Sequence, residues 1–336
     1  ARTLRDALTS ERAYNSATRA KAFDLLRGLL PMATRTNVGV FANGRAFEYL
    51  ITRLGSHDLV EIQQVSDQLQ QALDHLIPSF VKRSKTPRGS AMRQYMAGIR
   101  HGLAAQARHL TTPAVQQATP QVTLTAYDHD ALIRVASAAL YPHTTQALTD
   151  VVAHVSSLSH AELVQIIALA AGERSVRFHK PGRAYEETHY TFDIIADIGA
   201  YRDLQRHRML TQIRQPFGVD LGFMVPPELR EAGLDAAYCA AIEHASAFVR
   251  QCRADVGEAS QYAVPMACLM RWSVTLNLRE AYHLCELRSA PQGHPTYRAV
   301  AQQIYHAIHA VHPELVAAMT FVDLNSYELE RLDSER

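Results

Sequence analysis

The stretch HYTFDIIADIGAYRDLQRHR, residues 189–208, carries the clearest structural and chemical signals in the chain. Its first part, His189–Ile198, is rich in aromatic and β-branched residues and predicts a strand. Arg206, His207 and Arg208 follow side by side. Arginine forks bind phosphate through paired hydrogen bonds, and a histidine between them can donate to a phosphate or contact a cofactor ring. The stretch therefore indicates an anion site after a strand, or else a solvated helix face with an acidic neighbour such as Asp203.

The bulk composition excludes several classes of protein. The chain has 336 residues, 47% of them hydrophobic, and a formal net charge of +1. It can bury a sizeable core, and it lacks the overall basic field that favours nucleic acid. No apolar run approaches the roughly 18 residues of a membrane span, and the first residues have no signal-peptide core, so we expect a cytoplasmic protein. The four cysteines have no CxxC spacing; we interpret them as reduced thiols, with disulfides or metal binding as alternatives.

The periodicity along the chain is mostly helical. Residues 1–30, 43–54 and 58–81 predict helices, and the lysine- and arginine-rich stretch 81–93 predicts a basic loop. Residues 109–130 are rich in Thr, Gln and Pro and have little periodicity. We therefore predict a first, partial repeat over residues 1–108, a linker over 109–130, and a second, fuller repeat over 131–330.

An internal repeat supports this division. PMATRTNVGVFANGRAFEYL begins at Pro31, and PMACLMRWSVTLNLREAYHL begins at Pro265, an ungapped offset of 234 residues. Pro-Met-Ala and Asn-x-Arg coincide at this single offset, which chance explains less well than a duplication. The first copy has no counterpart of the Arg-His-Arg region.

Asn277, Arg279 and Arg288 form a second candidate set. Asn277 and Arg288 are eleven residues apart, about three helical turns, and share a helix face. An Asn amide can donate to and accept from the edge of a heterocycle. The alternative is that Asn277 only caps a helix that carries surface arginines.

Two other site types are disfavoured. His306, His309 and His312 recur every third residue, a spacing that zinc can use, but they drift around the helix without a nearby carboxylate, and we predict no metal site. No GxGxxG follows a strand, so a dinucleotide would not be held in a Rossmann site.

Together the two sets resemble the flavin-dependent thymidylate synthase family. The resemblance covers roughly residues 15–105 and 170–320. It rests on Glu186, the TFDI strand Thr191–Ile194, Arg206–Arg208, the Asn277-Leu278-Arg279 motif and Leu287-Arg288. It implies an α+β fold of the thymidylate synthase complementing-protein type, helix-rich, with helices packed on a curved antiparallel sheet and a partial internal duplication.

The same resemblance implies the ligands. FAD would be the cofactor, NADPH and methylenetetrahydrofolate the co-substrates, and dUMP the pyrimidine nucleotide that is methylated at uracil C5. The assembly would be a homo-oligomer, a dimer of tandem chains that mimics the family's tetramer. The resemblance implies neither a membrane nor a nucleic acid as partner.

Carried over by position, two groups of residues would bind these ligands. FAD would be contacted by Arg206, His207, Arg208, Asn277, Arg279, His283, Glu186, Asn43 and Arg45. The nucleotide would be contacted by Arg27, Arg206, Arg214 and Arg288. Arg288 would be catalytic, because a cation beside uracil N3 lowers its pKa and stabilises an enolate.

The chain departs from the family on the nucleotide side. Pro216 and Gly218 stand where the family has Ser and Arg, and Gln261 replaces a phosphate-binding Arg in the second copy. Two alternatives therefore stay open. One is a flavin-dependent enzyme acting on a different pyrimidine nucleotide or base; the other is a non-catalytic homologue that acts as a binding or scaffold subunit.

The duplication leads to a first prediction. If one repeat supplies Arg27, Asn43 and Arg45 and the other supplies Arg206, they build one hybrid site, and Arg27→Ala and Arg206→Ala should each abolish binding of the same ligand. Equilibrium dialysis with dUMP and with FAD measures this. Unchanged binding of every ligand in either variant would contradict the hybrid site.

Overall fold

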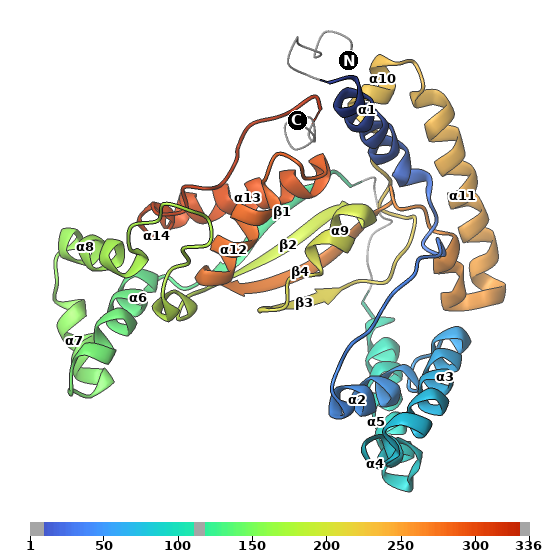
Figure 1. The fold of residues 1–336 in the computed structure, drawn as a ribbon, viewed down its shortest axis with the longest axis horizontal. Helices are drawn as coiled ribbons and strands as arrows, with labels where there is room; N and C mark the ends of the chain where they lie inside the picture. The colour runs from blue at the N-terminus through green and yellow to red at the C-terminus, as the bar shows by residue number, and fades with distance from the viewer. Residues whose placement is uncertain (1–9, 111–117, 330–336) are drawn as a thin grey trace. The chain divides into compact units, whose positions relative to one another are not determined.

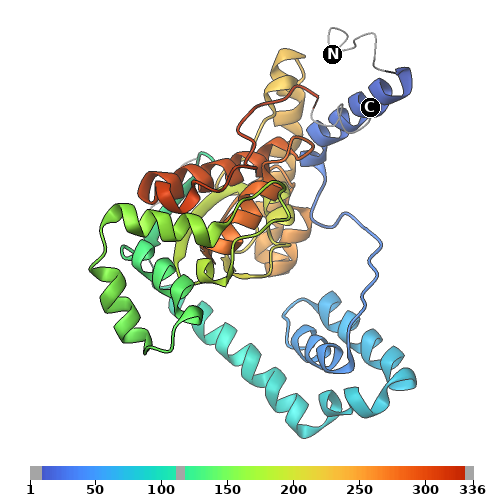
Figure 2. The ribbon, with the colours of Figure 1, turned by 60° about the vertical axis from the view of Figure 1, so that its left-hand side comes forward.

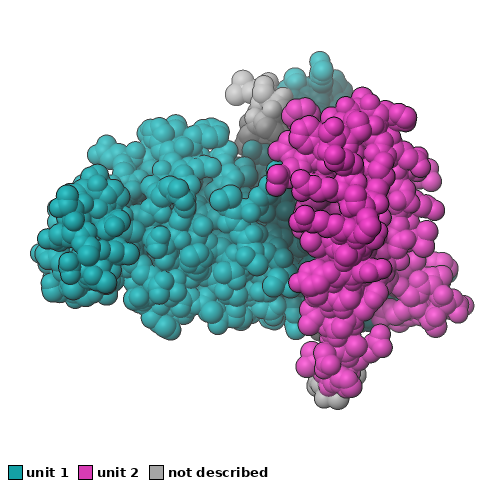
Figure 3. Space-filling view, turned by 90° about the horizontal axis from the view of Figure 1, so that it is seen from below, with its two compact units in different colours: residues 1–32, 116–247, 264–336 teal, residues 33–115, 248–263 magenta. Residues whose placement is uncertain are grey.

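The computed structural model describes residues 10–110 and 118–329. The chain divides into two compact units, drawn in two colours in Figure 3. The first unit comprises residues 1–32, 116–247 and 264–336, and the second comprises residues 33–115 and 248–263. Within the described residues no helix is long and apolar enough to cross a bilayer.

The centre of the first unit is a four-stranded antiparallel sheet in the order β1-β2-β4-β3 (Figure 1). Its strands are β1 Gln121–Tyr127, β2 His189–Asp197, β3 Leu210–Arg214 and β4 Leu269–Asn277. Burial alternates along β4, with Trp272, Val274 and Leu276 inside, as expected of a sheet with one covered face. The predicted strand at the start of the Arg-His-Arg stretch is β2, and the helix-rich α+β fold with an antiparallel sheet is confirmed.

Helices cover this sheet and extend beyond it. The helix α13 packs along β1 and β2, and α12 joins the end of β4 to α13 (Figures 1 and 2). The helices of the first unit are α1 Glu11–Leu26, α6 Ala131–Leu140, α7 Leu148–Ser156, α8 His160–Ala171, α9 Ile198–Leu204, α10 Pro227–Glu231, α12 Leu278–Arg288, α13 Pro295–Val311 and α14 Pro313–Val316. The helix α11, Asp235–Val256, begins in the first unit and ends in the second.

The second unit is built from helices. They are α2 Gly44–Leu54, α3 Val60–Leu76, α4 Pro78–Val81 and α5 Pro87–Ala107. Its small core consists of Ile51, Leu73 and Val81. The Ser66 hydroxyl donates to the Ile51 carbonyl at 2.8 Å and ties α3 to α2.

Two predicted segments differ from the structure. The predicted linker 109–130 contains β1, an edge strand that pairs only with β2 and whose residues are mostly exposed or half-buried, so its Thr- and Gln-rich sequence gives little hydrophobic signal. Residues 111–117 of that segment lie outside the described residues. The predicted basic loop 81–93 instead forms the short 3-10 helix Lys82–Lys85 and the start of α5, where Pro87 occupies the first helical turn that tolerates it.

The helices of the second unit repeat those of the first in length and order. The helices α2 and α12 both have 11 residues, α3 and α13 both have 17, and α4 and α14 both have four. Asn43 caps α2 by accepting from the Ala46 backbone N–H, and Asn277 caps α12 by accepting from the Glu280 N–H. Pro31 and Pro265, which begin the two repeated sequences, face each other in an antiparallel bridge.

A buried ion pair connects separate segments of the first unit. Arg174 donates to both carboxylate oxygens of Glu286 at 2.6 Å, and the two side chains are 3% and 2% exposed. Arg174 also donates to the Ala318 carbonyl and lies over the rings of Tyr282 and Phe321. The pair therefore connects the loop after α8 to α12 and to the residues that follow α14.

We expect Glu286→Ala to lower the free energy of unfolding by about 3–5 kcal/mol, because it leaves the buried Arg174 charge without its partner. Denaturant unfolding measures the change. The matched control is Asp130→Ala, which removes an exposed ion pair with Arg134 and should cost at most about 1 kcal/mol. Equal effects of the two substitutions would contradict this reading.

Candidate active site

The sheet register explains why two motifs far apart in sequence meet. β2 ends at Asp197, which pairs with Leu269 at the start of β4. β3 begins opposite Leu276, near the other end of β4. The chain must therefore run back along the length of the sheet between β2 and β3. The seven-residue helix α9 makes most of that return. Residues 206–208 therefore lie just before Leu210, at the end of β4 where α12 starts.

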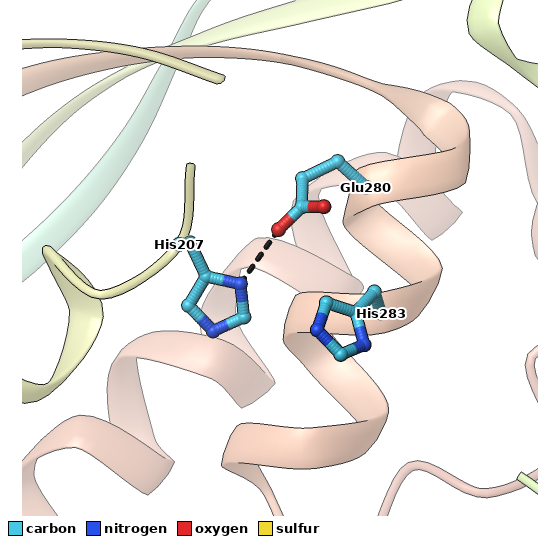
Figure 4. A group of neighbouring side chains, drawn as sticks. All are labelled: His207, Glu280 and His283. Atoms are coloured by element: carbon cyan, nitrogen blue, oxygen red, sulfur yellow. Dashed lines mark hydrogen bonds and ion pairs between the residues drawn. The ribbon is translucent and has the colours of Figure 1, made fainter. Parts of the chain in front are cut away.

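His207 connects the two motifs. Its Nδ1 lies 2.6 Å from Oε1 of Glu280 (Figure 4). Its Nε2 lies 3.0 Å from Nε of Arg288, which can only donate. Nε2 is therefore the acceptor, and Nδ1–H donates to the carboxylate. The His207 side chain is 2% exposed and that of Glu280 is 7% exposed, so the inner bond of this Glu280–His207–Arg288 chain of hydrogen bonds is shielded from water, while Arg288 at its end is half-buried.

His283 lies beside this chain, with its ring centroid 5.2 Å from that of His207 (Figure 4). Burial lowers the pKa of His283, because the charged imidazolium would lose its hydration. His207, Glu280 and His283 offer ligand atoms within 4.8 Å of one another, a spacing compatible with a metal ion. A metal on His207 would have to displace either Glu280 or Arg288, since both ring nitrogens already have partners.

Arg279 and Glu186, both predicted on the flavin side, lie in contact. Nη1 of Arg279 donates to Oε1 of Glu186 at 3.1 Å, and Nε donates to the Pro181 carbonyl at 2.9 Å. Arg183 binds the other oxygen of the same carboxylate. The Glu186 carboxylate thus connects Arg279 of α12 to Arg183 in the turn before β2.

Arg27 and Arg206 share one carboxylate. Nη2 of Arg27 lies 3.7 Å from Asp203, and Nη2 of Arg206 lies 3.5 Å from it. Arg206 is 70% exposed, and Arg208 is exposed as well. Arg214 is elsewhere, with its guanidinium 4.2 Å from the centroid of Phe217.

Asn43 and Arg45 belong to the second unit. Asn43 caps α2, and Arg45 lines a cavity of about 420 Å³ together with Tyr49, Arg83 and Arg88. The structure therefore brings Glu280, His207 and Arg288 together in the first unit, and Arg27 and Arg206 together at Asp203. Asn43 and Arg45 are placed only within their own unit.

These observations can be set against known proteins. The profile of the family described as "Thymidylate synthase complementing protein" matches residues 123–314, more than half of the chain. The chain belongs to the thymidylate synthase complementing protein family. The resemblance seen in the sequence is thereby confirmed.

Three longer curated proteins are similar to this chain. UPF0159 proteins of Chlamydia pneumoniae and Chlamydia muridarum are 38% and 37% identical over 333 residues, which is 98% of this chain and 63% of each relative. A UPF0159 protein of Thermoplasma acidophilum is 31% identical over 330 residues, covering 97% of this chain and 64% of the relative. The chain therefore spans less than two thirds of the length of these curated relatives.

The chain is also similar to one solved protein over a smaller part of its length. The UMP/dUMP methylase PolB from Streptomyces cacaoi, bound with 5-Br dUMP, is 20% identical with a TM-score of 0.49, covering 61% of this chain and 96% of PolB. With 5-Br UMP the TM-score is 0.46 at 19% identity, covering 62% of this chain and 98% of PolB.

Sequence reasoning missed Glu280, Asp197 and His294 in this chain. Glu280 directly follows Arg279 in α12, and the sequence pattern does not distinguish it from a surface residue. Only its burial in the structure points to its contact with His207. Asp197 caps α9 by accepting from the Ala200 N–H at 2.9 Å. The one available signal was an acidic residue at the end of a hydrophobic strand, a typical helix N-cap.

Buried Asp197 and half-buried His294 form a polar cluster with Arg27. Burial raises the pKa of the Asp197 carboxyl, and the neighbouring His294 and Arg27 oppose that rise. Burial lowers the pKa of His294 from 6.5, and the Arg27 charge lowers it further. A Cβ on Gly199 would lie 2.7 Å from Asp197 Oδ1 and 3.1 Å from Arg27 Nη2, so any larger residue there would have to displace these charged groups.

The depressed His294 pKa makes stability depend on pH. Below about pH 6.5 the unfolded chain binds a proton that folded His294 refuses, so stability is lost as the pH falls. Asp197 acts in the opposite sense, because its raised pKa lets the folded protein keep a proton. We expect His294→Gln to reduce the loss of thermal stability between neutral and mildly acidic pH. The exposed His306→Gln is the control, and an identical pH slope in both variants would refute the assignment.

Proposed function

We propose that this chain carries a flavin-dependent site that methylates C5 of a pyrimidine, with dUMP as the first candidate substrate. The observation that carries the proposal is the Glu280–His207–Arg288 chain of hydrogen bonds. It joins the Arg-His-Arg motif to the arginine at the end of α12. Family membership supports the same reaction class.

The donor set fits FAD. Exposed Arg206 and Arg208 offer guanidinium groups suited to a pyrophosphate, while Asn277 and Arg279 offer amide and guanidinium donors at the start of α12. His283 and Glu186 complete the proposed set within the first unit. Bound FAD, reduced by NADPH, would supply the electrons that convert the methylene group of methylenetetrahydrofolate into a methyl group.

Arg288 has the central role among the protein's own residues. Its guanidinium stays charged at any working pH, and beside uracil N3 it would favour the anionic form of the ring and stabilise developing enolate charge. His207 accepts from Nε of Arg288 while Glu280 holds the His207 tautomer. The guanidinium is thus oriented before substrate arrives, which is the condition for electrostatic stabilisation.

A different pyrimidine nucleotide or base is the second candidate. Asp203 pairs with both Arg27 and Arg206, so the two cations proposed for the nucleotide share one negative charge. Pro216 and Gly218 supply no side-chain donor for a phosphate. Comparison of dUMP, UMP and their nucleosides in a labelled-methylene assay separates this candidate from dUMP methylation.

The proposal predicts that turnover and cofactor binding can be lost separately. Arg288→Ala should lower turnover by about 100-fold or more while keeping the flavin absorption band, because it removes charge stabilisation and not cofactor binding. Arg206→Ala should weaken retention of FAD after desalting. Visible spectra and labelled dUMP-to-dTMP conversion measure the two effects.

The exposed Arg230→Ala on α10 is the control and should change neither readout. A wild-type protein that stays colourless after reconstitution with FAD would leave only the alternative of a non-catalytic binding or scaffold subunit. Full flavin content with unaltered turnover in Arg288→Ala would overturn the role of Arg288.

A further inference from the structure

Two histidines and a carboxylate meet near the start of α12. Nδ1 of His207 lies 2.6 Å from Oε1 of Glu280, and His207, Glu280 and His283 each offer a ligand atom within 4.8 Å of the others. Figure 4 shows the three side chains pointing toward one another. Two imidazoles and one carboxylate are a common ligand set of Zn²⁺, in which water or substrate takes the fourth position.

The spacing of residues in α12 supplies two of these three ligands. Glu280 and His283 are three residues apart, and residues at this spacing are neighbours on a helix surface. Helical bundle metalloproteins present two ligands to their ions by the same Glu-x-x-His pattern. The third ligand, His207, comes from the segment between α9 and β3, which the sheet register brings to the same place.

The matching helix of the repeat lacks these ligands. By the offset of 234 residues, Ala46 and Tyr49 of α2 stand where α12 has Glu280 and His283. The helix α2 nevertheless has the same length as α12 and also begins after a capping Asn. Neither ligand is therefore needed to form such a helix, and their presence in α12 points to a role toward His207.

Two of the ligands are held firmly, and the third has freedom to adjust. The side chains of His207 and Glu280 are 2% and 7% exposed, whereas His283 is half-buried. Zinc holds nitrogen and oxygen ligands at about 2.0–2.2 Å, which in a tetrahedron places the ligand atoms about 3.3 Å apart. The His207–Glu280 pair has to open slightly, and His283, which faces solvent on one side, has to move toward it.

We propose that Glu280, His207 and His283 bind one Zn²⁺ ion, and that this ion releases Arg288. Without an ion, the His207 proton is on Nδ1, and Nε2 accepts from Nε of Arg288. The ion takes the lone pair of Nδ1, so the single proton of the neutral ring moves to Nε2. Nε2–H and the guanidinium are then both donors, and their hydrogen bond is lost.

Zinc would therefore inhibit the proposed methylation. This consequence rests on the proposed function, in which an oriented Arg288 lies beside the pyrimidine. The released side chain would keep its contact with Tyr297, whose ring centroid lies 5.6 Å from the guanidinium carbon. The binding of the ion itself does not depend on the proposed function, so the two can be tested apart.

Zinc binding is tested on the full chain after removal of metal with a chelator. When Zn²⁺ competes with a chromophoric chelator near pH 7, we expect one ion to bind per chain. His283→Asn should weaken this binding by at least about tenfold, because an amide replaces an imidazole ligand. The matched control is His306→Asn, which removes an exposed histidine of α13 and should leave the affinity unchanged. A wild-type chain that binds no ion, or equal affinity of wild type and His283→Asn, would overturn the site.

The release of Arg288 is read without any activity by ¹⁵N NMR of protein labelled at histidine. We expect Zn²⁺ to move the His207 proton from Nδ1 to Nε2, and a tautomer that stays unchanged with zinc bound would overturn the release.

Turnover in the labelled-methylene assay is the second readout. Zn²⁺ should lower wild-type turnover by at least about tenfold, and the chelator should restore it. Unchanged turnover of the zinc-bound protein would also contradict the release of Arg288. A chain that binds zinc and shows the tautomer change, but has no turnover in any condition, would contradict the proposed function and support the metal site.

Discussion

The candidate site depends on one buried hydrogen bond, from Nδ1–H of His207 to Glu280. This bond sets the tautomer of His207, and the tautomer makes Nε2 the acceptor for Arg288. Without the carboxylate, the imidazole could present a donor to a guanidinium that has only donors. The orientation of Arg288 therefore follows from a residue three positions inside α12 and from the sheet register that delivers His207 to it.

The two repeated helix sets show how far local sequence determines structure. The helices α2 and α12 have equal lengths and each begins after a capping Asn, and α3 and α13 also have equal lengths, although the surroundings of the two pairs differ. Capping and apolar periodicity act within a few residues, and they survive when the sheet is absent. Residues 35–43 form no strand in the part of the chain that the structure describes, because a strand forms only beside a neighbour that pairs with its backbone N–H and C=O groups.

The predictable parts of the fold were those with strong local signals. Strand β2 was predicted from its β-branched and aromatic residues, and α2 and α3 from their apolar spacing. Strand β1 was missed inside the predicted linker, because its Thr- and Gln-rich sequence becomes a strand only beside β2. The helical start of α5 was missed because a lysine- and arginine-rich stretch with a proline looks like a loop.

From the residue types alone one could name Arg206, His207, Asn277, Arg279 and Arg288 as candidates and recognise the family. Residue type and spacing show which chemistry a side chain can do. They could not show that Glu280 binds His207, or that Asp203 lies between Arg27 and Arg206. Those contacts join segments far apart in the chain, and their partners are selected by sheet register and burial, which exist only once the chain has folded.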